Sequence, residues 1–369
     1  MYIGISPLLY KTIYMISALL LTLYYSIVVV RRSIVRNRAK VIDSGLLYFY
    51  LFILTFFIGL RPVDICFGDM GGYDIYFKMC KGEAFQVSSE WLFDRLMWMC
   101  AQVMPSHWFF FIVMVLYVVP TVIAAKRLLP NYAGILLVFW IGAFVFWGGA
   151  VNGIRNAVAL SLVALAITYI DGKLKDKLVC VLLLISAVGF HKSALLPAMC
   201  LLFVKLYPKP QVMFYFWFLS IPLSLMSGNS ISSLFAGLGF DDRFSQYVLG
   251  GQDTYLMSNF SRTGFRWDFL LYSFMPVLLG WYVVVKRKYL DRKYLLLLGT
   301  YIYANAFWIL VIRSSFSNRF AGLSWFIYPF VIAYPLLKFP VFKKNHVQKT
   351  SYIMFAHFGF TFFMWLIGK

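Results

Sequence analysis

The chain has 369 residues, of which 62% are hydrophobic and only 13% are charged. Soluble domains carry about 25% charged residues, so this composition excludes an ordinary soluble protein and predicts a polytopic membrane protein. The net charge of +20 would suit nucleic acid, but the basic residues lie in short clusters between apolar runs, as at 31–40 and 286–288. Such clusters are typical of cytoplasmic loops, so we expect no nucleic-acid partner.

Apolar runs of the length of a membrane helix, about 17–25 residues, recur along the whole chain. They predict an all-α transmembrane helical bundle in one integral membrane domain over residues 1–369. We expect about twelve spans, at residues 12–30, 44–60, 108–125, 132–150, 154–171, 178–190, 193–207, 211–227, 267–285, 294–312, 320–337 and 350–367. Placing the basic clusters in the cytoplasm puts both termini outside.

Two large external loops follow from this topology, at about 61–107 and 228–266. Within the first loop, residues 91–104 form an apolar run that carries charged side chains. This pattern predicts an amphipathic helix lying in the membrane interface rather than another span. Cys66 and Cys80 share the same loop and could pair, although unpaired thiols are an equal alternative.

Arginines that the topology does not require lie at the external ends of the predicted spans. Guanidinium groups bind phosphate through paired hydrogen bonds, so their placement predicts a phosphate-bearing ligand at the outer face. The candidate ligands are Arg61, Arg155, Arg243, Arg313 and Arg319. Each also has a structural alternative, because an arginine at a membrane edge can simply extend its head group to the interface.

The apolar stretch 178–207 is interrupted at His191. Two short helices that meet at an external His191 keep the lysine clusters on either side of this stretch in the cytoplasm. Imidazole, with an ordinary pKa near about 6.5, suits proton exchange at neutral pH, so His191 is the leading candidate for a general base. Asp69 and Glu90 are rivals for that role, or they orient His191 or an arginine. A histidine that bonds only a backbone carbonyl at a helix end is the structural alternative.

Several short segments follow one another in order between residues 60 and 320. They are Leu60-Arg61, Asp69-Met-Gly-Gly-Tyr73, Glu90-Trp-Leu-Phe, Gly153-Ile-Arg155-Asn156-Ala-Val-Ala, Gly189-Phe-His191-Lys-Ser-Ala and Asn318-Arg319-Phe320. Together they resemble the motifs of the EpsG family of Wzy-like polysaccharide polymerases. Asn156 departs from the pattern, because the family's motif has glutamine there. The loop 228–266 matches no motif, which would fit a region that reads the particular sugar.

The resemblance implies a GT-C-like helical fold and a glycosyltransferase. Its substrate would be an undecaprenyl-pyrophosphate-linked oligosaccharide, polymerised at the outer face of the bacterial inner membrane. The implied partners are this lipid-linked substrate, the lipid bilayer and a Wzz-like chain-length regulator, and we expect neither a cofactor nor a bound metal. The catalytic candidates are His191, Arg155, Glu90 and Asp69, and the pyrophosphate would be bound by Arg61, Arg155, Asn156, Arg243, Arg313 and Arg319.

Three other functions remain open at the level of sequence. A lipid-linked oligosaccharide flippase shares the ligand, but transporters of this kind are commonly built from internal repeats, and the sequence shows none. An O-antigen ligase of the same superfamily would differ only in its acceptor. A membrane O-acyltransferase would need catalytic groups reachable from a cytoplasmic donor, whereas His191 faces outward in the predicted topology.

Overall fold

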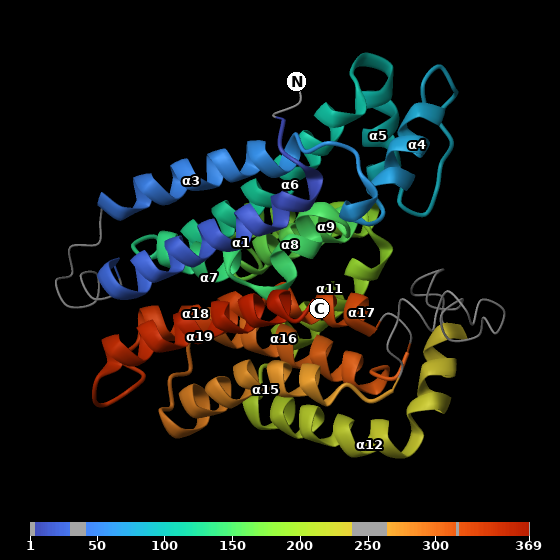
Figure 1. Ribbon diagram of the computed structural model, residues 1–369. Helices are drawn as coiled ribbons and strands as arrows, with labels where there is room; N and C mark the ends of the chain where they lie inside the picture. The colour runs from blue at the N-terminus through green and yellow to red at the C-terminus, as the bar shows by residue number, and fades with distance from the viewer. Residues whose placement is uncertain (1–3, 30–41, 238–263, 315–316, 369) are drawn as a thin grey trace. The chain divides into compact units, whose positions relative to one another are not determined.

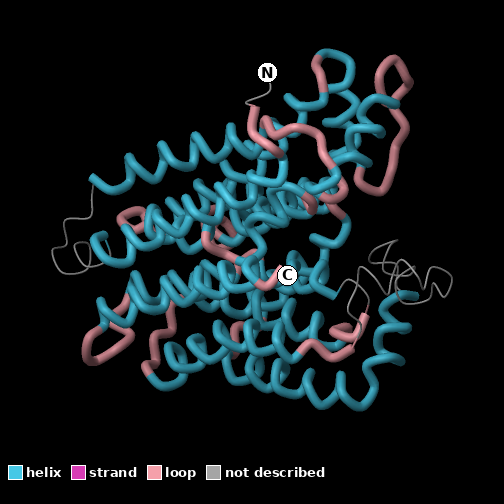
Figure 2. Tube along the Cα trace, viewed as in Figure 1, coloured by secondary structure: helices cyan, strands magenta, loops and turns pink. Residues whose placement is uncertain are grey.

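The computed structural model describes residues 4–29, 42–237, 264–314 and 317–368. Within these residues every regular element is a helix (Figures 1 and 2), which confirms the all-α prediction. The longer helices are α1 (Pro7–Tyr24), α3 (Ile42–Gly59), α4 (Met70–Met79), α5 (Trp91–Val103), α6 (Ser106–Leu128), α7 (Ala133–Ile141), α8 (Phe144–Val151), α9 (Ile154–Ile167), α10 (Leu174–Phe190), α11 (Leu195–Leu206), α12 (Pro210–Gly237), α15 (Trp267–Trp281), α16 (Arg292–Leu310), α17 (Ser317–Trp325), α18 (Tyr328–Lys338) and α19 (His346–Leu366). Each apolar run predicted as a span falls on one of these helices or on a consecutive pair.

The chain divides into two compact units, with one boundary between His191 and Lys192 and the other inside α18. Unit 1 consists of Met1–His191 with Ala333–Lys369, and unit 2 consists of Lys192–Ile332. In unit 1, α9 packs against both α6 and α10, while α3 packs on α6 and α1 packs on α19. In unit 2, α16 packs against α11, α12 and α17. A single domain over residues 1–369 stays a prediction.

Length and composition identify several helices that could cross a membrane. Among the described residues four helical segments qualify, and the bent pair α7–α8 would be a fifth; the four are Pro7–Ile27, Ser106–Leu128, Trp267–Lys286 and Ser317–Lys338. The other helices are shorter or less apolar. For example, the 14 residues of α9 extend over about 21 Å at a rise of about 1.5 Å per residue, less than the hydrocarbon thickness of about 30 Å. The protein is therefore a membrane protein, and the number of about twelve spans stays a prediction.

The run predicted as one span at 132–150 is broken into α7 and α8, which meet at a bend of 74°. Breaking a helix inside a bilayer frees backbone carbonyls that lipid cannot satisfy. Side chains from other helices bond these carbonyls: the Tyr14 hydroxyl donates to Ile141 O at 2.6 Å, and the Thr361 hydroxyl donates to Gly142 O at 2.8 Å. The His357 ring nitrogen Nε2 lies 2.9 Å from Phe139 O. The bend is thus supported by α1 and α19.

Small residues let α9 pack closely in unit 1. Ala157, Ser161 and Ala164 lie on one face of the helix and are buried. A side chain added at Gly149 of α8 would lie 3.1 Å from the Cβ of Ala157, and the Ser161 hydroxyl lies 3.3 Å from Leu116 O of α6. Close helix packing through small residues is common in membrane proteins, and here it fixes the start of α9 next to the end of α8.

The predicted external loop 61–107 is structured. It contains a short 3₁₀ turn at Ile65–Phe67, then α4 and α5, at the end of unit 1 where α3 ends and α6 begins (Figure 1). The helix predicted at 91–104 is α5, and it buries one face, made of Phe93, Met97, Cys100 and Ala101. Helix α4 was not predicted. Cys66 and Cys80 are both free thiols.

Candidate active site

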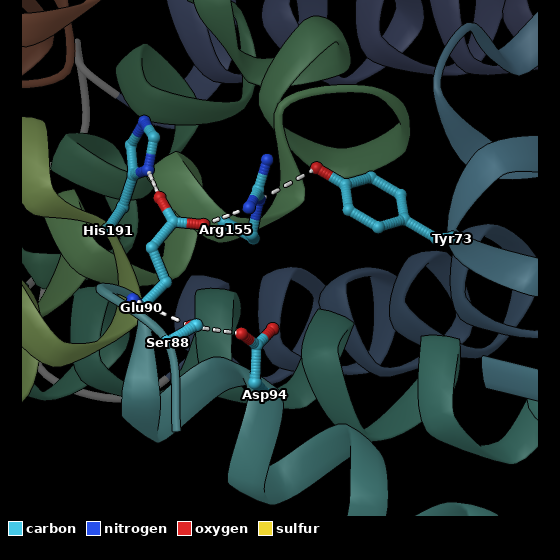
Figure 3. Close-up of polar contacts among 6 residues, drawn as sticks. All are labelled: Tyr73, Ser88, Glu90, Asp94, Arg155 and His191. Atoms are coloured by element: carbon cyan, nitrogen blue, oxygen red, sulfur yellow. Dashed lines mark hydrogen bonds and ion pairs between the residues drawn. The ribbon is translucent and has the colours of Figure 1, made fainter. Parts of the chain in front are cut away.

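His191 lies where α10 ends, at the predicted break. The helix stops at Phe190, and His191 adopts an extended backbone with φ −156° and ψ 120° while its N–H still donates to Ala187 O at 3.0 Å. Its side chain is therefore directed away from the helix axis, at the end of unit 1 that holds the loop 61–107. The ring nitrogen Nδ1 contacts the carboxylate of Glu90 (Figure 3).

Glu90 is the residue that joins the site. It occupies the cap position just before α5 and binds two partners through its two oxygens: Oε1 contacts His191 Nδ1, and Oε2 accepts from Arg155 Nη1 (Figure 3). Its own side chain is 12% exposed. A carboxylate that is this well buried needs cationic or N–H partners to offset its desolvation, and Arg155 and His191 supply them.

Arg155 is in the first turn of α9 and is held from both sides. Besides Glu90, its Nε donates to the hydroxyl of Tyr73 on α4 at 3.1 Å. The guanidinium carbon also lies 5.4 Å from the centre of the Tyr73 ring and 5.7 Å from that of Phe93, distances at which cation–π attraction contributes. The terminal nitrogen Nη2 takes part in neither of the two hydrogen bonds.

The three central side chains are shielded but reachable. Arg155 is 20% exposed, His191 is 18% exposed and Glu90 is 12% exposed. With Glu90 ionised, the Glu90–Arg155 pair carries no net charge. If the Nδ1–H of His191 donates to Glu90, the lone pair of the imidazole lies on Nε2, which points away from Glu90 in Figure 3. The arrangement can therefore orient a neutral histidine as a proton acceptor.

A second carboxylate fixes the turn that carries Glu90. The Ser88 hydroxyl donates to Asp94, and the backbone N–H of Glu90 donates to Ser88 Oγ at 3.0 Å (Figure 3). Burial raises the pKa of the Asp94 carboxyl, and the hydrogen bond from Ser88 partly opposes that rise. A serine hydroxyl can bond the backbone two residues further on and so fix a turn.

Helices α5 and α10 approach closely beside this cluster. A side chain at Gly189 would lie 3.0 Å from atoms of both Trp91 and Leu92. Glycine at this position thus permits the start of α5 to contact the end of α10. This close approach brings Glu90, one residue before Trp91, within reach of His191.

Arg61, which was predicted to bind pyrophosphate, is buried and bonds backbone carbonyls. Its side chain is only 1% exposed, and its terminal nitrogens donate to Ile58 O at 2.8 Å and Val151 O at 2.9 Å. Burial lowers the pKa of the guanidinium to about 9, so it remains a cation at neutral pH. Its terminal nitrogens are thus bonded to the backbone, and its part in pyrophosphate binding stays a prediction.

Asp69 and Asn156 lie on segments that also carry residues of the cluster. Asp69 precedes α4, and its backbone N–H donates to Asn152 Oδ1 at 2.9 Å. Asn156 follows Arg155 on α9, and its Oδ1 is buried without a hydrogen-bond partner among the described residues. A buried unpaired acceptor costs about 1–3 kcal/mol, so this amide is a candidate for contact with a substrate hydroxyl.

Two of the remaining predicted arginines belong to unit 2, and the third is not among the described residues. Arg313 and Arg319 are in unit 2, where Arg313 Nη2 donates to Leu225 O at 3.3 Å and Arg319 lies on α17. Arg243 lies outside the described residues, as does most of the predicted loop 228–266. Their part in pyrophosphate binding stays a prediction.

Sequence reasoning missed four residues that support the site: Tyr73, Ser88, Asp94 and Asn152. Tyr73 ends one of the segments that resemble the family's motifs, but its contact with Arg155 was not predicted. A serine two residues before Glu90 was an available signal, because a serine hydroxyl can bond the backbone two residues further on. Nothing in the sequence alone indicated that Asn152 would bond to the backbone of residue 69.

Comparison with known proteins gives one match. The sequence model of the EpsG family matches residues 45–369, which contain every residue of the candidate site. No curated protein and no solved structure matches the chain. The matched range covers most of the chain, and the membrane helices agree with a role in polysaccharide biosynthesis. The chain therefore belongs to the EpsG family, and is a membrane protein of the polysaccharide-polymerase type.

Proposed function

We propose that this protein is a glycosyltransferase that joins undecaprenyl-pyrophosphate-linked oligosaccharide repeat units into O-antigen or exopolysaccharide. The observation that carries the proposal is the bridging of Arg155 and His191 by one carboxylate, that of Glu90. The two partners suit the two requirements of the reaction: a base for the acceptor hydroxyl, and positive charge for a departing pyrophosphate.

The transfer step assigns a task to each group. The acceptor hydroxyl oxygen attacks the anomeric carbon of the donor sugar, and the bond from that carbon to the phosphate oxygen breaks. The electron pair leaves with undecaprenyl pyrophosphate, and the hydroxyl proton passes to Nε2 of His191. Glu90 stabilises the imidazolium that forms. Arg155 holds Glu90 through Nη1 and presents Nη2 to the pyrophosphate, with Asn156 beside it.

We also propose a membrane arrangement: a GT-C-like bundle of about twelve spans in the inner membrane, with the Glu90 cluster at the periplasmic face. Two features of unit 1 support it. The ends of α3, α8 and α10 and the starts of α6 and α9 lie at the same end as the loop 61–107 (Figure 1). The opposite ends carry basic side chains, including Arg127, whose Nη2 lies 3.7 Å from Asp176. Positive side chains favour the cytoplasm.

The test is a gel of surface polysaccharide from a strain that lacks this chain, complemented with variants. The unmodified chain should restore a ladder, whereas Arg155→Ala should give only the band of one repeat unit. Arg155→Lys keeps the charge but loses the separate guanidinium nitrogens that bond Glu90 and Tyr73, so its ladder should be short. Arg127→Lys, at the other end of unit 1, is the matched control and should restore a full ladder at an equal protein level.

The outcomes separate this function from its competitors. Loss of the single-unit band in the strain without the chain would indicate a flippase or an earlier assembly step. Full-length polymer that stays on the lipid carrier would indicate a ligase. A full ladder from both Arg155→Ala and Arg155→Lys would refute the role of the Glu90 cluster. A Wzz-like regulator would be a partner in setting chain length, which its co-purification with the chain would test.

A further inference from the structure

Asn152 links two segments that carry residues of the candidate site. It lies in the turn between α8 and α9, three residues before Arg155. Its side-chain oxygen accepts from the backbone N–H of Asp69 at 2.9 Å. Asp69 in turn precedes α4, and its carbonyl oxygen accepts from the N–H of Tyr73 at 3.1 Å. One carboxamide therefore joins the start of α9 to the start of α4.

The same turn is held from the other side by Arg61. Its Nη2 donates to the carbonyl of Val151, the residue before Asn152, at 2.9 Å. The guanidinium carbon lies 5.3 Å and 5.6 Å from the ring centres of Phe67 and Phe110. The segment 61–69 is thus fixed to the turn 151–152 at both of its ends.

Glycine at position 68 makes the approach of Asn152 possible. Gly68 has a φ of +71°, and a side chain there would overlap the carboxamide of Asn152. Left-handed backbone of this kind is readily adopted by glycine. The contact is therefore a close one, and the position of the Asn152 amide is set by the backbone around it.

We propose that Asn152 is a positioning residue for the transfer reaction: its carboxamide oxygen fixes α4 to α9 so that Tyr73 and Glu90 hold the guanidinium of Arg155. This inference rests on the proposed function of the Glu90 cluster. The Tyr73 hydroxyl meets Arg155 Nε at 3.1 Å, so a shift of α4 relative to α9 changes the aim of Arg155 directly. A displacement of about 1 Å in a reacting group can cost on the order of 100-fold in rate.

The experiment compares two substitutions of similar size. Asn152→Leu removes the acceptor for the Asp69 N–H, whereas Asn152→Asp keeps an oxygen at that position. Asn131→Leu, at an exposed asparagine after α6, is the matched control. At equal protein levels in the membrane, we expect Asn152→Leu to lower polymer yield about tenfold or more. Asn152→Asp should largely restore the ladder, and Asn131→Leu should leave it unchanged.

A double substitution distinguishes positioning from general stability. If Asn152 acts through the Tyr73–Arg155 contact, combining Asn152→Leu with Tyr73→Phe should cost little more than the worse single substitution, because both remove the same restraint. Additive losses, an Asn152→Leu ladder equal to that of the unmodified chain, or an Asn152→Asp ladder as short as that of Asn152→Leu would each overturn the inference. If Arg155→Ala abolishes the ladder while Asn152→Leu does not, only this inference fails and the proposed function stands.

Discussion

Glu90 contacts two side chains of different chemistry, and its charge decides what each can do. A carboxylate accepts hydrogen bonds on both oxygens, so it can hold the guanidinium of Arg155 and the Nδ1–H of His191 at once. An amide cannot, because its nitrogen donates. A glutamine at this position would bond Nδ1 as a donor and move the ring proton to Nε2.

Glu90→Gln should therefore reduce polymerisation by about 10²–10⁴-fold, the usual contribution of a general base. Glu90→Asp keeps the charge but shortens the side chain, and should retain partial activity. The measurement is the yield of polymer from lipid-linked repeat units added to purified protein. Glu83→Gln, at an exposed glutamate of the same loop, is the control. Activity of Glu90→Gln equal to that of the control would remove His191 from the role of base.

Asp94, which accepts a hydrogen bond from Ser88, makes the stability of the folded protein depend on pH. Burial raises the pKa of its carboxyl in the folded protein. Between the pKa of the unfolded state and that of the folded state, the folded protein therefore binds more protons than the unfolded protein. The folded state then loses stability as the pH rises from below the ordinary aspartate pKa of about 3.9 through the higher pKa of the folded state.

Asp94→Asn removes this dependence and keeps an acceptor for Ser88. We expect its unfolding temperature in detergent, relative to that of the unmodified chain, to rise between pH 4 and pH 8. Asp64→Asn should show the opposite trend, at pH values near and below the ordinary aspartate pKa of about 3.9, because hydrogen bonds from Cys66, the backbone N–H foremost, lower the pKa of the Asp64 carboxyl. Parallel trends in the two variants would contradict the assignment.

The bend between α7 and α8 is the element that redirects the chain toward the site. A straight helix over 133–151 would satisfy its own carbonyls, whereas the bend exposes those of residues 139, 141 and 142. Donors from α1 and α19 satisfy them. The position of α8, and hence of the turn that leads to Arg155, depends on these helices, which are distant in sequence.

Thr361→Val should destabilise unit 1, because it leaves the carbonyl of Gly142 without its side-chain donor. The expected loss is about 1–3 kcal/mol, the cost of leaving a buried acceptor unpaired. Thr350→Val is the control on the same helix, because the Thr350 hydroxyl bonds His346 O, the carbonyl four residues earlier that helical backbone bonding already serves. Thermal unfolding in detergent should show a lower midpoint for Thr361→Val than for Thr350→Val. Equal midpoints would mean that the bend does not need this donor.

At the scale of the whole molecule, the distribution of charge predicts which end of unit 1 faces outward. The loop 61–107 and the Glu90 cluster lie at one end, and the basic residues Lys126, Arg127 and Lys173 lie near the opposite helix ends. The positive-inside rule places the basic end in the cytoplasm.

Single cysteines in a chain without its native cysteines test this orientation. Val87 is 80% exposed and Leu174 is 73% exposed, so a thiol at either position is accessible to a reagent on its own side. In intact spheroplasts, a membrane-impermeant maleimide should label Val87→Cys and should label Leu174→Cys only after permeabilisation. The reverse pattern would invert the topology and place the candidate site in the cytoplasm.

The sequence by itself determined the class of the protein and most of its helices. Long apolar runs must become helices in a bilayer, because no other local structure satisfies its own backbone there. The break at His191 and the amphipathic helix at 91–104 could be predicted for a second reason: a charged side chain within an apolar run is costly in a bilayer. The motifs also indicated His191, Arg155 and Glu90 as candidate residues and led to the EpsG family.

Only the tertiary structure decided which candidates meet. It joined Glu90 to both Arg155 and His191, although these residues lie 65 and 101 positions apart. It buried Arg61 against backbone carbonyls, and it showed the hydrogen bonds of Tyr73 to Arg155 and of Asn152 to the backbone of Asp69. The residue pattern of one segment cannot predict these contacts, because a side chain's partner depends on how helices distant in sequence pack together. The periodicity of one helix carries no information about that packing.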